Sequence, residues 1–188
     1  MKPLVSRMFN IRKATLNDCR GIAEVQVDSY RSAYADFFPQ SYLEHFTYEE
    51  EEQDWFSLLN ANTGDILYVA ATPDEGIVGY VLAQVKLDIH PGYDAEIVAL
   101  HVRLTTRYKG LGRALLRAAL QELDSLHCSS VMLWTLQGNP TRQWYEQLQG
   151  ILLGEKHYQV EDWDIVEVAY GWKPISNLLQ RLQSREAG

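Results

Sequence analysis

The sequence predicts a single α/β domain built on a mixed sheet with helices on both faces. Its 188 residues suit one domain, and 46% of them are hydrophobic, which is enough for a sizeable core. A hairpin comes early in the chain, and a strand–helix–strand unit follows later. Hairpins pair strands antiparallel whereas such a crossover pairs them in parallel, so the sheet is expected to be mixed.

The first half of the chain predicts one strand, two helices and three further strands. Thr15, followed three residues later by Asp18, caps the first helix, and Pro39 interrupts the helical pattern. The turn PDEG between two β-rich runs is a strong hairpin signal. The expected elements are a strand at 9–14, helices at 15–34 and 48–59, and strands at 65–72, 76–87 and 95–102.

The second half alternates helices and strands. Apolar side chains recur at spacings of three and four in one helix, at Leu111, Ala114, Leu115, Ala118, Ala119 and Leu123. Pro140 stands at a favoured first position of a short helix. The last helix has one apolar face, formed by Ile175, Leu178, Leu179 and Leu182. The expected elements are helices at 111–126, 140–148 and 175–182, and strands at 130–136, 151–160 and 164–172.

Composition and charge exclude several classes of protein. The net charge of −8 disfavours a nucleic-acid partner. Cys19 and Cys128 form no CxxC pair, and the five histidines show no metal-ligand spacing. Residues 1–10 lack the apolar core of a secretory signal, and no stretch approaches the roughly 18 apolar residues of a membrane helix. We therefore expect a cytoplasmic protein without a metal or a membrane partner.

The segment RYKGLGRALL (107–116) is a cationic, glycine-rich turn that opens into a helix. Such a turn exposes backbone N–H groups and suits an anion. A Walker phosphate loop is excluded because Arg113 and Ala114 follow Gly112 where Lys and Ser or Thr are needed. A dinucleotide fingerprint is disfavoured, because Leu115 replaces its last glycine and the following strand carries no acidic residue.

The pattern R-x-x-G-x-G after a strand resembles the pyrophosphate loop of the GNAT family of acetyl-CoA-dependent N-acetyltransferases. Its flanks resemble the same family, in the segments AEIVALHV, NPTRQWYEQLQGILLGEK and EVAYGW. The resemblance covers about residues 9–172. It implies one domain over 9–172 with a central, mostly antiparallel mixed sheet, and a helical extension over 173–188.

The resemblance also implies acetyl-CoA as cosubstrate and no metal. The strand at 95–102 would pair its backbone with the pantetheine arm, and the loop would hold the diphosphate. The implied cofactor-binding residues are Leu100, His101, Val102, Arg107, Tyr108, Lys109, Gly110, Leu111, Gly112, Arg113, Asn139 and Tyr145.

Two residues are the candidates for catalysis. Tyr145 matches the family's tyrosine, which donates a hydrogen bond to the leaving thiolate. With ordinary pKa values of about 10 for a phenol and 8.5 for a thiol, full proton transfer is uphill by roughly 2 kcal/mol. Glu96 alternates with Val98, Leu100 and Val102 and is a candidate base for the amine, the alternative being a solvated strand residue. The glutamate of the family's peptide-N-terminal members would fall at Trp134.

The expected reaction moves the acetyl group to a primary amine of a small molecule or peptide by direct attack. Family resemblance places the acceptor between the first two helices and the last strands, where Tyr30, Tyr34 and Phe38 could line it. The alternatives are a transferase using another acyl-CoA, or a non-catalytic CoA-binding sensor or interaction protein. The apolar stripe of the last helix needs cover, either from its own core or from the partner in a homodimer.

Overall fold

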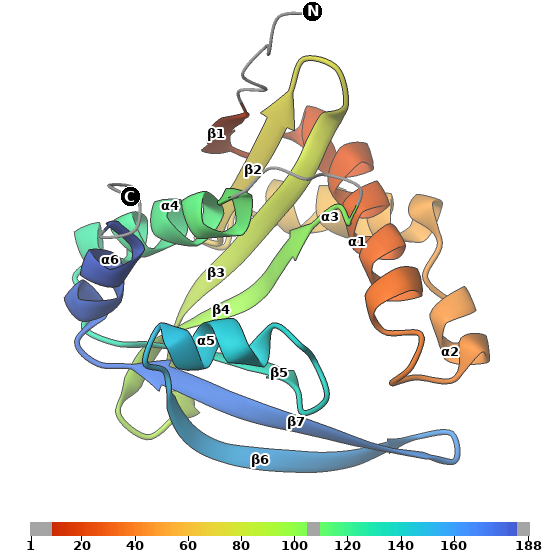
Figure 1. The fold of residues 1–188 in the computed structure, drawn as a ribbon. Helices are drawn as coiled ribbons and strands as arrows, with labels where there is room; N and C mark the ends of the chain where they lie inside the picture. Colours follow the sequence, from red (N-terminus) through yellow and green to blue (C-terminus); the bar gives the residue numbers. More distant parts are fainter. Residues whose placement is uncertain (1–8, 105–109, 184–188) are drawn as a thin grey trace, which may run out of the picture.

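The computed structural model describes residues 9–104 and 110–183, apart from the side chains of residues 87–89. The described residues form seven strands and six helices (Figure 1). The strands are β1 (Asn10–Lys13), β2 (Ile66–Thr72), β3 (Gly76–His90), β4 (Tyr93–Val102), β5 (Val131–Leu136), β6 (Ile151–Val160) and β7 (Trp163–Trp172). The helices are α1 (Cys19–Ala33), α2 (Gln40–Glu44), α3 (Tyr48–Ala61), α4 (Leu111–Ser125), α5 (Arg142–Gln147) and α6 (Ile175–Gln183), and a 3₁₀ turn, Leu16–Asp18, precedes α1.

The strands form one sheet in the order β1-β2-β3-β4-β5-β7-β6. Neighbouring strands are antiparallel except for β4 and β5, so the predicted mixed, mostly antiparallel sheet is confirmed. β4 and β5 pair only at Glu96–Met132 and Ile97–Leu133. The two strands therefore separate beyond Ile97, and this separation positions the site.

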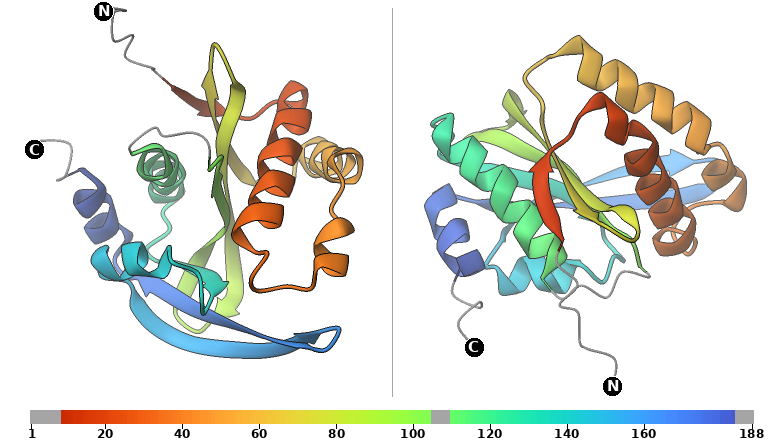
Figure 2. Two further views of the ribbon diagram at one scale, coloured as in Figure 1. Left: turned by 45° about the vertical axis from the view of Figure 1, so that its right-hand side comes forward. Right: turned by 90° about the horizontal axis from the view of Figure 1, so that it is seen from above.

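Helices cover both faces of the sheet, as predicted (Figure 2). α1 and α3 lie on one face, over a core that contains Ile22, Trp55 and Tyr80. α4 and α6 lie on the other, over the larger core that contains Leu115 and Leu178. Among the described residues, no helix combines the length and apolar character needed to cross a membrane.

Two elements differ from the sequence prediction. Helix α2 lies where only a break at Pro39 was expected, because Pro39, with φ −55°, is the residue from which a new short helix starts. Strand β3 continues to His90 and turns back into β4 at Tyr93. Gly92 takes φ 86° in that turn, a conformation that glycine adopts without a Cβ penalty.

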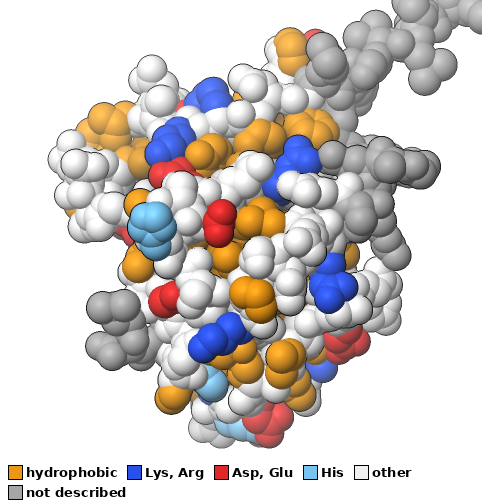
Figure 3. All heavy atoms as spheres, turned by 90° about the vertical axis from the view of Figure 1, so that its left-hand side faces the viewer, with side chains coloured by type: hydrophobic (Ala, Val, Ile, Leu, Met, Phe, Trp, Pro, Cys, Tyr) orange, Lys and Arg blue, Asp and Glu red, His pale blue; other side chains and the backbone are white. Residues whose placement is uncertain are grey.

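Helix α6 packs against its own chain. Ile175, Leu178 and Leu182 are buried in the core beneath α4, and Leu179 packs on its margin. Figure 3 views the side of the molecule that carries α4 and α6, where apolar side chains are interspersed with charged ones. The apolar side chains of α6 are thus buried within their own chain. They are not exposed as they would have to be to form a homodimer interface through this helix.

Candidate active site

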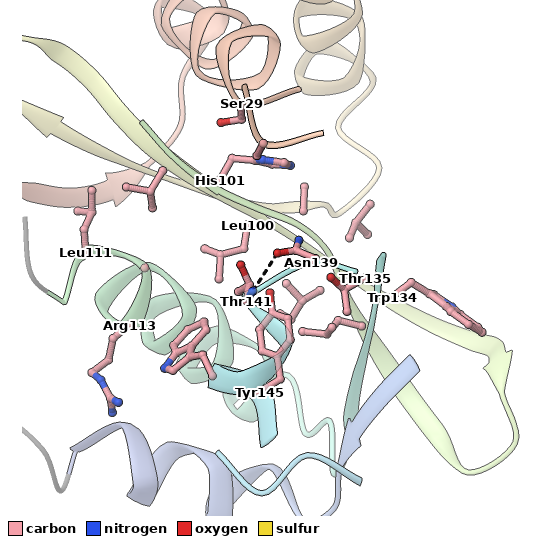
Figure 4. A pocket seen from close by; sticks show the side chains of 18 of the residues that line it. Ser29, Leu100, His101, Leu111, Arg113, Trp134, Thr135, Asn139, Thr141 and Tyr145 are labelled. Carbon is pink, nitrogen blue, oxygen red and sulfur yellow. Dashed lines mark hydrogen bonds between the residues drawn. The ribbon is translucent and has the colours of Figure 1, made fainter. Parts of the chain in front are cut away.

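The separation of β4 and β5 opens a first cavity of about 490 Å³, drawn in Figure 4. Its walls come from the second half of α1, β4, β5, the start of α4 and α5 with the turn before it. Beyond Ile97, β4 has no described partner strand on its β5 side. Backbone groups along that edge are therefore open to a ligand that pairs as another strand would.

The start of α4 closes one end of the first cavity. Gly110 has φ 86°, and a Cβ there would meet no atom of the described residues within 4 Å, so the glycine is required by the backbone conformation of the turn. Ala114 N–H donates to the Gly110 carbonyl at 2.9 Å and makes the first turn of the helix. The N–H groups of Leu111, Gly112 and Arg113 have no acceptor within the helix, which makes this end suited to an anion.

Some of the residues expected to bind the cofactor also make contacts within the protein, and others fall outside the described residues. Arg107, Tyr108 and Lys109 fall outside the described residues. The Leu111 side chain is buried in the core, so only its backbone can meet a ligand. The Arg113 guanidinium lines the cavity and also donates to the carbonyls of Arg181 (3.0 Å) and Leu182 (3.2 Å) at the end of α6.

Asn139 lines the first cavity, but its side chain also forms a hydrogen bond within the turn that leads into α5. Its Oδ1 accepts a hydrogen bond from the Thr141 N–H at 2.9 Å, the bond that Figure 4 marks with a dashed line. This bond fixes the orientation of the amide, whose NH₂ group and second oxygen lone pair remain to meet a ligand.

Tyr145 rises from α5 toward Leu100 on β4 (Figure 4). It is 6% exposed, and its ring contacts Trp144, Tyr170 and Trp172. In the described part of the chain, its hydroxyl forms no hydrogen bond with another residue. Burial raises the pKa of Tyr145 to about 12, so the phenol keeps its proton and faces the cavity as a neutral donor.

A second cavity, of about 390 Å³, lies on the other side of β4, beneath α1 and α2. Tyr30, Tyr34 and Phe38 line it, as the sequence interpretation placed them. Aromatic rings dominate its walls in the described part of the chain, and seven of them contribute: Tyr30, Tyr34, Phe38, Tyr42, Phe46, Trp134 and Tyr158. The sequence analysis did not identify four of these, because they come from four segments that only the fold brings together.

The face predicted for Glu96 is wrong. Pairing with β3 shifts between Leu82–Ala99 and Ala83–Ile97, which leaves Val98 as a bulge in β4. A bulge inserts one residue and reverses the alternation beyond it. Leu100 and Val102 accordingly pack on the α4 side, whereas Glu96 lies in the second cavity with Ala99 and His101.

Glu96 is not a solvated strand residue. Its carboxylate is 13% exposed and accepts a hydrogen bond from the Lys86 ammonium at 2.9 Å. A second carboxylate of this cavity, Glu167, is paired in the same way with Lys156 at 2.6 Å. Sequence reasoning missed Lys156 and Glu167, since each lies on a strand whose partner the local pattern does not specify.

The His101 side chain lines both cavities, although the sequence interpretation considered only its backbone. Figure 4 shows His101 and Leu100 on opposite sides of β4. Its ring lies among those of Tyr30, Tyr34 and Tyr80, with centroids 5.6, 6.2 and 5.4 Å away. Burial lowers the pKa of His101 to about 4, so the imidazole is neutral near pH 7.

Neither cysteine belongs to the site. Cys19 and Cys128 are buried and line neither cavity, and burial raises the pKa of both thiols. Within residues 9–104 and 110–183, no group of three or more His, Cys, Asp or Glu side chains is placed to hold a metal ion.

The two cavities and the anion-binding end of α4 agree with what the comparisons show. The model of the Acetyltransferase (GNAT) family matches residues 27–151. The chain belongs to the GNAT family. Membership makes it an acetyltransferase, with acetyl-CoA as the implied cosubstrate.

Relatives share most of the chain. An N-acetyltransferase from Bacillus subtilis, YuaI, whose activity is uncharacterized, is 29% identical over 91% of this chain and 96% of its own. A spermidine N(1)-acetyltransferase from Thermoplasma acidophilum is 25% identical over 59% of this chain and 68% of its own. The structure of PaiA N-acetyltransferase from Thermoplasma acidophilum, in complex with coenzyme A, has a TM-score of 0.66 at 17% identity, covering 88% and 99% of the two chains. That structural likeness supports the GNAT fold.

The first cavity has the features that coenzyme A requires. N–H groups at the start of α4 that have no acceptor within the helix suit the diphosphate, and the open edge of β4 suits the amides of the pantetheine arm. Tyr145 lies where the edge of β4 meets α5. These features are compatible with the implied cosubstrate.

Proposed function

We propose that the protein transfers the acetyl group of acetyl-CoA to a primary amine of a small molecule or peptide by direct attack, without an acyl-enzyme. The observation that supports this most strongly is that the two cavities meet. Six described residues line both of them: Tyr34, Val98, Ala99, His101, Trp134 and Thr135. A thioester held in the first cavity can therefore be reached by an amine held in the second.

In this proposal the start of α4 and the edge of β4 hold the acyl donor. The N–H groups of Leu111, Gly112 and Arg113 bind the diphosphate together with the positive end of the helix dipole. The backbone near Leu100–Val102 pairs with the pantetheine amides. One N–H of that segment donates to the thioester carbonyl, and this bond strengthens as the oxygen becomes an oxyanion.

Tyr145 stabilises the leaving thiolate. When the amine nitrogen bonds to the carbonyl carbon, the C–S bond breaks and its electron pair passes to sulfur. With a phenol pKa of about 12 against about 8.5 for a thiol, complete proton transfer from Tyr145 would cost about 5 kcal/mol. Tyr145 therefore acts by donating a hydrogen bond to the thiolate. The second proton that the nitrogen loses as the amide forms passes to solvent, from which the thiolate takes its proton.

Glu96 deprotonates the acceptor amine. A lysine-like amine has a pKa near 10.4, so only about one molecule in 2,500 is unprotonated at pH 7. Glu96 is the carboxylate of β4 in the second cavity, and it accepts the ammonium proton before or during attack. The neutral His101 imidazole, which lines both cavities, orients the amine by accepting a hydrogen bond from its N–H.

The test is an assay with acetyl-CoA and a panel of primary amines that follows free thiol and the mass of the acetylated amine. Thiol release that depends on the amine and equals the product formed supports the proposal. Binding of CoA with no amine-dependent thiol release would contradict it and indicate a CoA-binding sensor. Propionyl-CoA, assayed beside acetyl-CoA, reports whether the acyl site accepts a longer chain.

A further inference from the structure

The second cavity is walled mainly by neutral aromatic rings. Its volume, about 390 Å³, falls in the roughly 300–1,000 Å³ range of small-ligand sites. Burial raises the pKa of Tyr34 to about 12 and that of Tyr30 further, so both phenols stay uncharged. In the described part of the chain, neither hydroxyl hydrogen-bonds to another residue. These walls offer flat apolar faces and uncharged polar atoms to a ligand.

Each carboxylate of this cavity forms an ion pair with a lysine of the chain. Glu96 pairs with Lys86 at 2.9 Å, and Glu167 pairs with Lys156 at 2.6 Å. Among the described lining residues, these two are the acidic ones. A second ammonium group, beyond the one that reacts, would have to compete with Lys156 for Glu167.

The Lys156 ammonium also occupies the aromatic surface that would otherwise bind a cation. It lies over the Trp134 ring at 4.6 Å and near the Tyr158 ring at 6.0 Å from the ring centroids. Two aromatic rings and a carboxylate make a cation-binding box, and here the chain fills that box with its own lysine.

We propose that the acceptor is a primary monoamine carried on a planar aromatic body, and that Lys156 excludes polyamines by occupying the cation-binding box of Trp134, Tyr158 and Glu167. The aromatic body stacks among Tyr30, Tyr34 and Phe38 while its one amine reaches the junction of the two cavities. A polyamine carries a second ammonium, which finds the box filled. This inference rests on the proposed acetyl transfer and names its acceptor class.

The experiment compares 2-phenylethylamine with spermidine at saturating acetyl-CoA, using thiol release to obtain kcat/KM. We expect 2-phenylethylamine to exceed spermidine by at least about tenfold. Spermidine turned over equally well or better would overturn the acceptor class while leaving acetyl transfer intact. If no amine in the panel released thiol, both the inference and the proposed function would fall.

Lys156→Met tests the role of the lysine. Removal of its ammonium frees Glu167 and Trp134, so kcat/KM for spermidine should rise by at least about tenfold, with no rise for 2-phenylethylamine. Lys156→Arg keeps the charge and should keep the wild-type preference. Lys13→Met removes a lysine that pairs with Glu122, away from both cavities, and is the matched control.

The Lys156 side chain is 47% exposed, so its replacement is compatible with folding, and melting curves check this. Unchanged spermidine kinetics in a folded Lys156→Met variant would overturn the exclusion role.

Discussion

At the scale of single residues, the site depends on polar groups that are wholly or partly buried and face the two cavities. Tyr145 and His101 both contribute a neutral polar group, and burial shifts the pKa of each in the direction that keeps it uncharged. A neutral phenol can donate to a thiolate, and a neutral imidazole can accept from an amine. Burial thus determines which hydrogen bonds these residues offer.

Tyr145→Phe removes one hydroxyl and leaves the ring packed against Trp144 and Trp172. Acetyl-CoA should still bind, as measured by calorimetry, and turnover should fall by about 10²–10³ because the thiolate loses its donor. Tyr68→Phe is the control, since the Tyr68 hydroxyl donates to Glu122 and lies outside both cavities. Wild-type turnover in Tyr145→Phe would remove this residue from the mechanism.

Glu96→Gln keeps the size of the side chain but removes the proposed base. With a high-pKa amine, turnover near pH 7 should drop and recover partly toward pH 9, where free amine becomes abundant. The pH–rate profiles of the variant and the wild type provide the measurement. Identical profiles from pH 6 to 9 would exclude Glu96 as the base.

His101 makes the unfolding free energy depend on pH. Its folded pKa, about 4, lies below the unfolded value of about 6.5, so the unfolded chain takes up a proton first. The stability linked to neutral His101 is present above pH 6.5 and is lost as the pH falls through 4, by about 3 kcal/mol in all. Urea unfolding of His101→Phe should lack this loss.

Asp18 provides the contrast to that experiment. The Arg12 guanidinium, at 2.7 Å, lowers the pKa of Asp18 from 3.8 to about 2. Its contribution is present above pH 3.8 and is lost as the pH falls through 2, so Asp18→Asn should flatten the curve only in that lower window. A His101→Phe curve parallel to wild type between pH 6.5 and 4 would contradict the burial of the imidazole.

Sequence reasoning could place residues whose position follows from their own segment. Gly110 and Gly112 could be placed at the start of α4 from the turn, and Tyr145 on α5 from the segment around it, and all three line the first cavity. The face of Glu96 could not, because the bulge at Val98 arises from pairing with β3. Lys156 was missed because its partners, Glu167 and Trp134, lie on two other strands.

At the scale of elements, α4 joins its glycine-rich start to the core of the molecule. Among the described residues, a Cβ at Gly112 would meet only Val102 Cγ2, at 3.9 Å, so these residues leave room for a side chain in the folded protein. A carboxylate at this end of a helix even favours the helix itself. Substitution here therefore separates ligand binding from folding.

CoA should raise the melting temperature of the wild type, because it binds the native state. Gly112→Asp should remove that rise, since its charge repels the phosphates, while the variant remains folded. Gly112→Asn adds the same bulk without the charge and should retain part of the rise. A full rise with Gly112→Asp, measured by differential scanning fluorimetry, would show that the diphosphate lies elsewhere.

Most elements could be predicted, because periodicity and turn residues report on local structure. The PDEG hairpin and the capping box of Thr15 and Asp18 are confirmed. The separation of β4 from β5 could not be derived from either strand alone, since it depends on how each pairs with its other neighbour. For the same reason the sequence did not decide what buries the apolar face of α6. In the structure that face packs against the core of its own chain.

At the scale of the whole molecule, β4 divides the site. In the proposed reaction the acyl donor lies on its α4 side and the amine on its α1 side, and the two cavities share lining residues where β4 leaves β5. Both substrates can then be bound at once, which direct transfer requires and which gives proximity its effect. The central claim is that these cavities form one continuous site.

The most direct test is the affinity of a bisubstrate conjugate, in which the sulfur of CoA is joined through an acetyl linker to the nitrogen of 2-phenylethylamine. One molecule would then fill both cavities, and calorimetry should show it binding at least about 100-fold more tightly than CoA. The gain should shrink in Phe38→Ala, which opens the aromatic wall of the second cavity. A conjugate that binds no more tightly than CoA would contradict a continuous site.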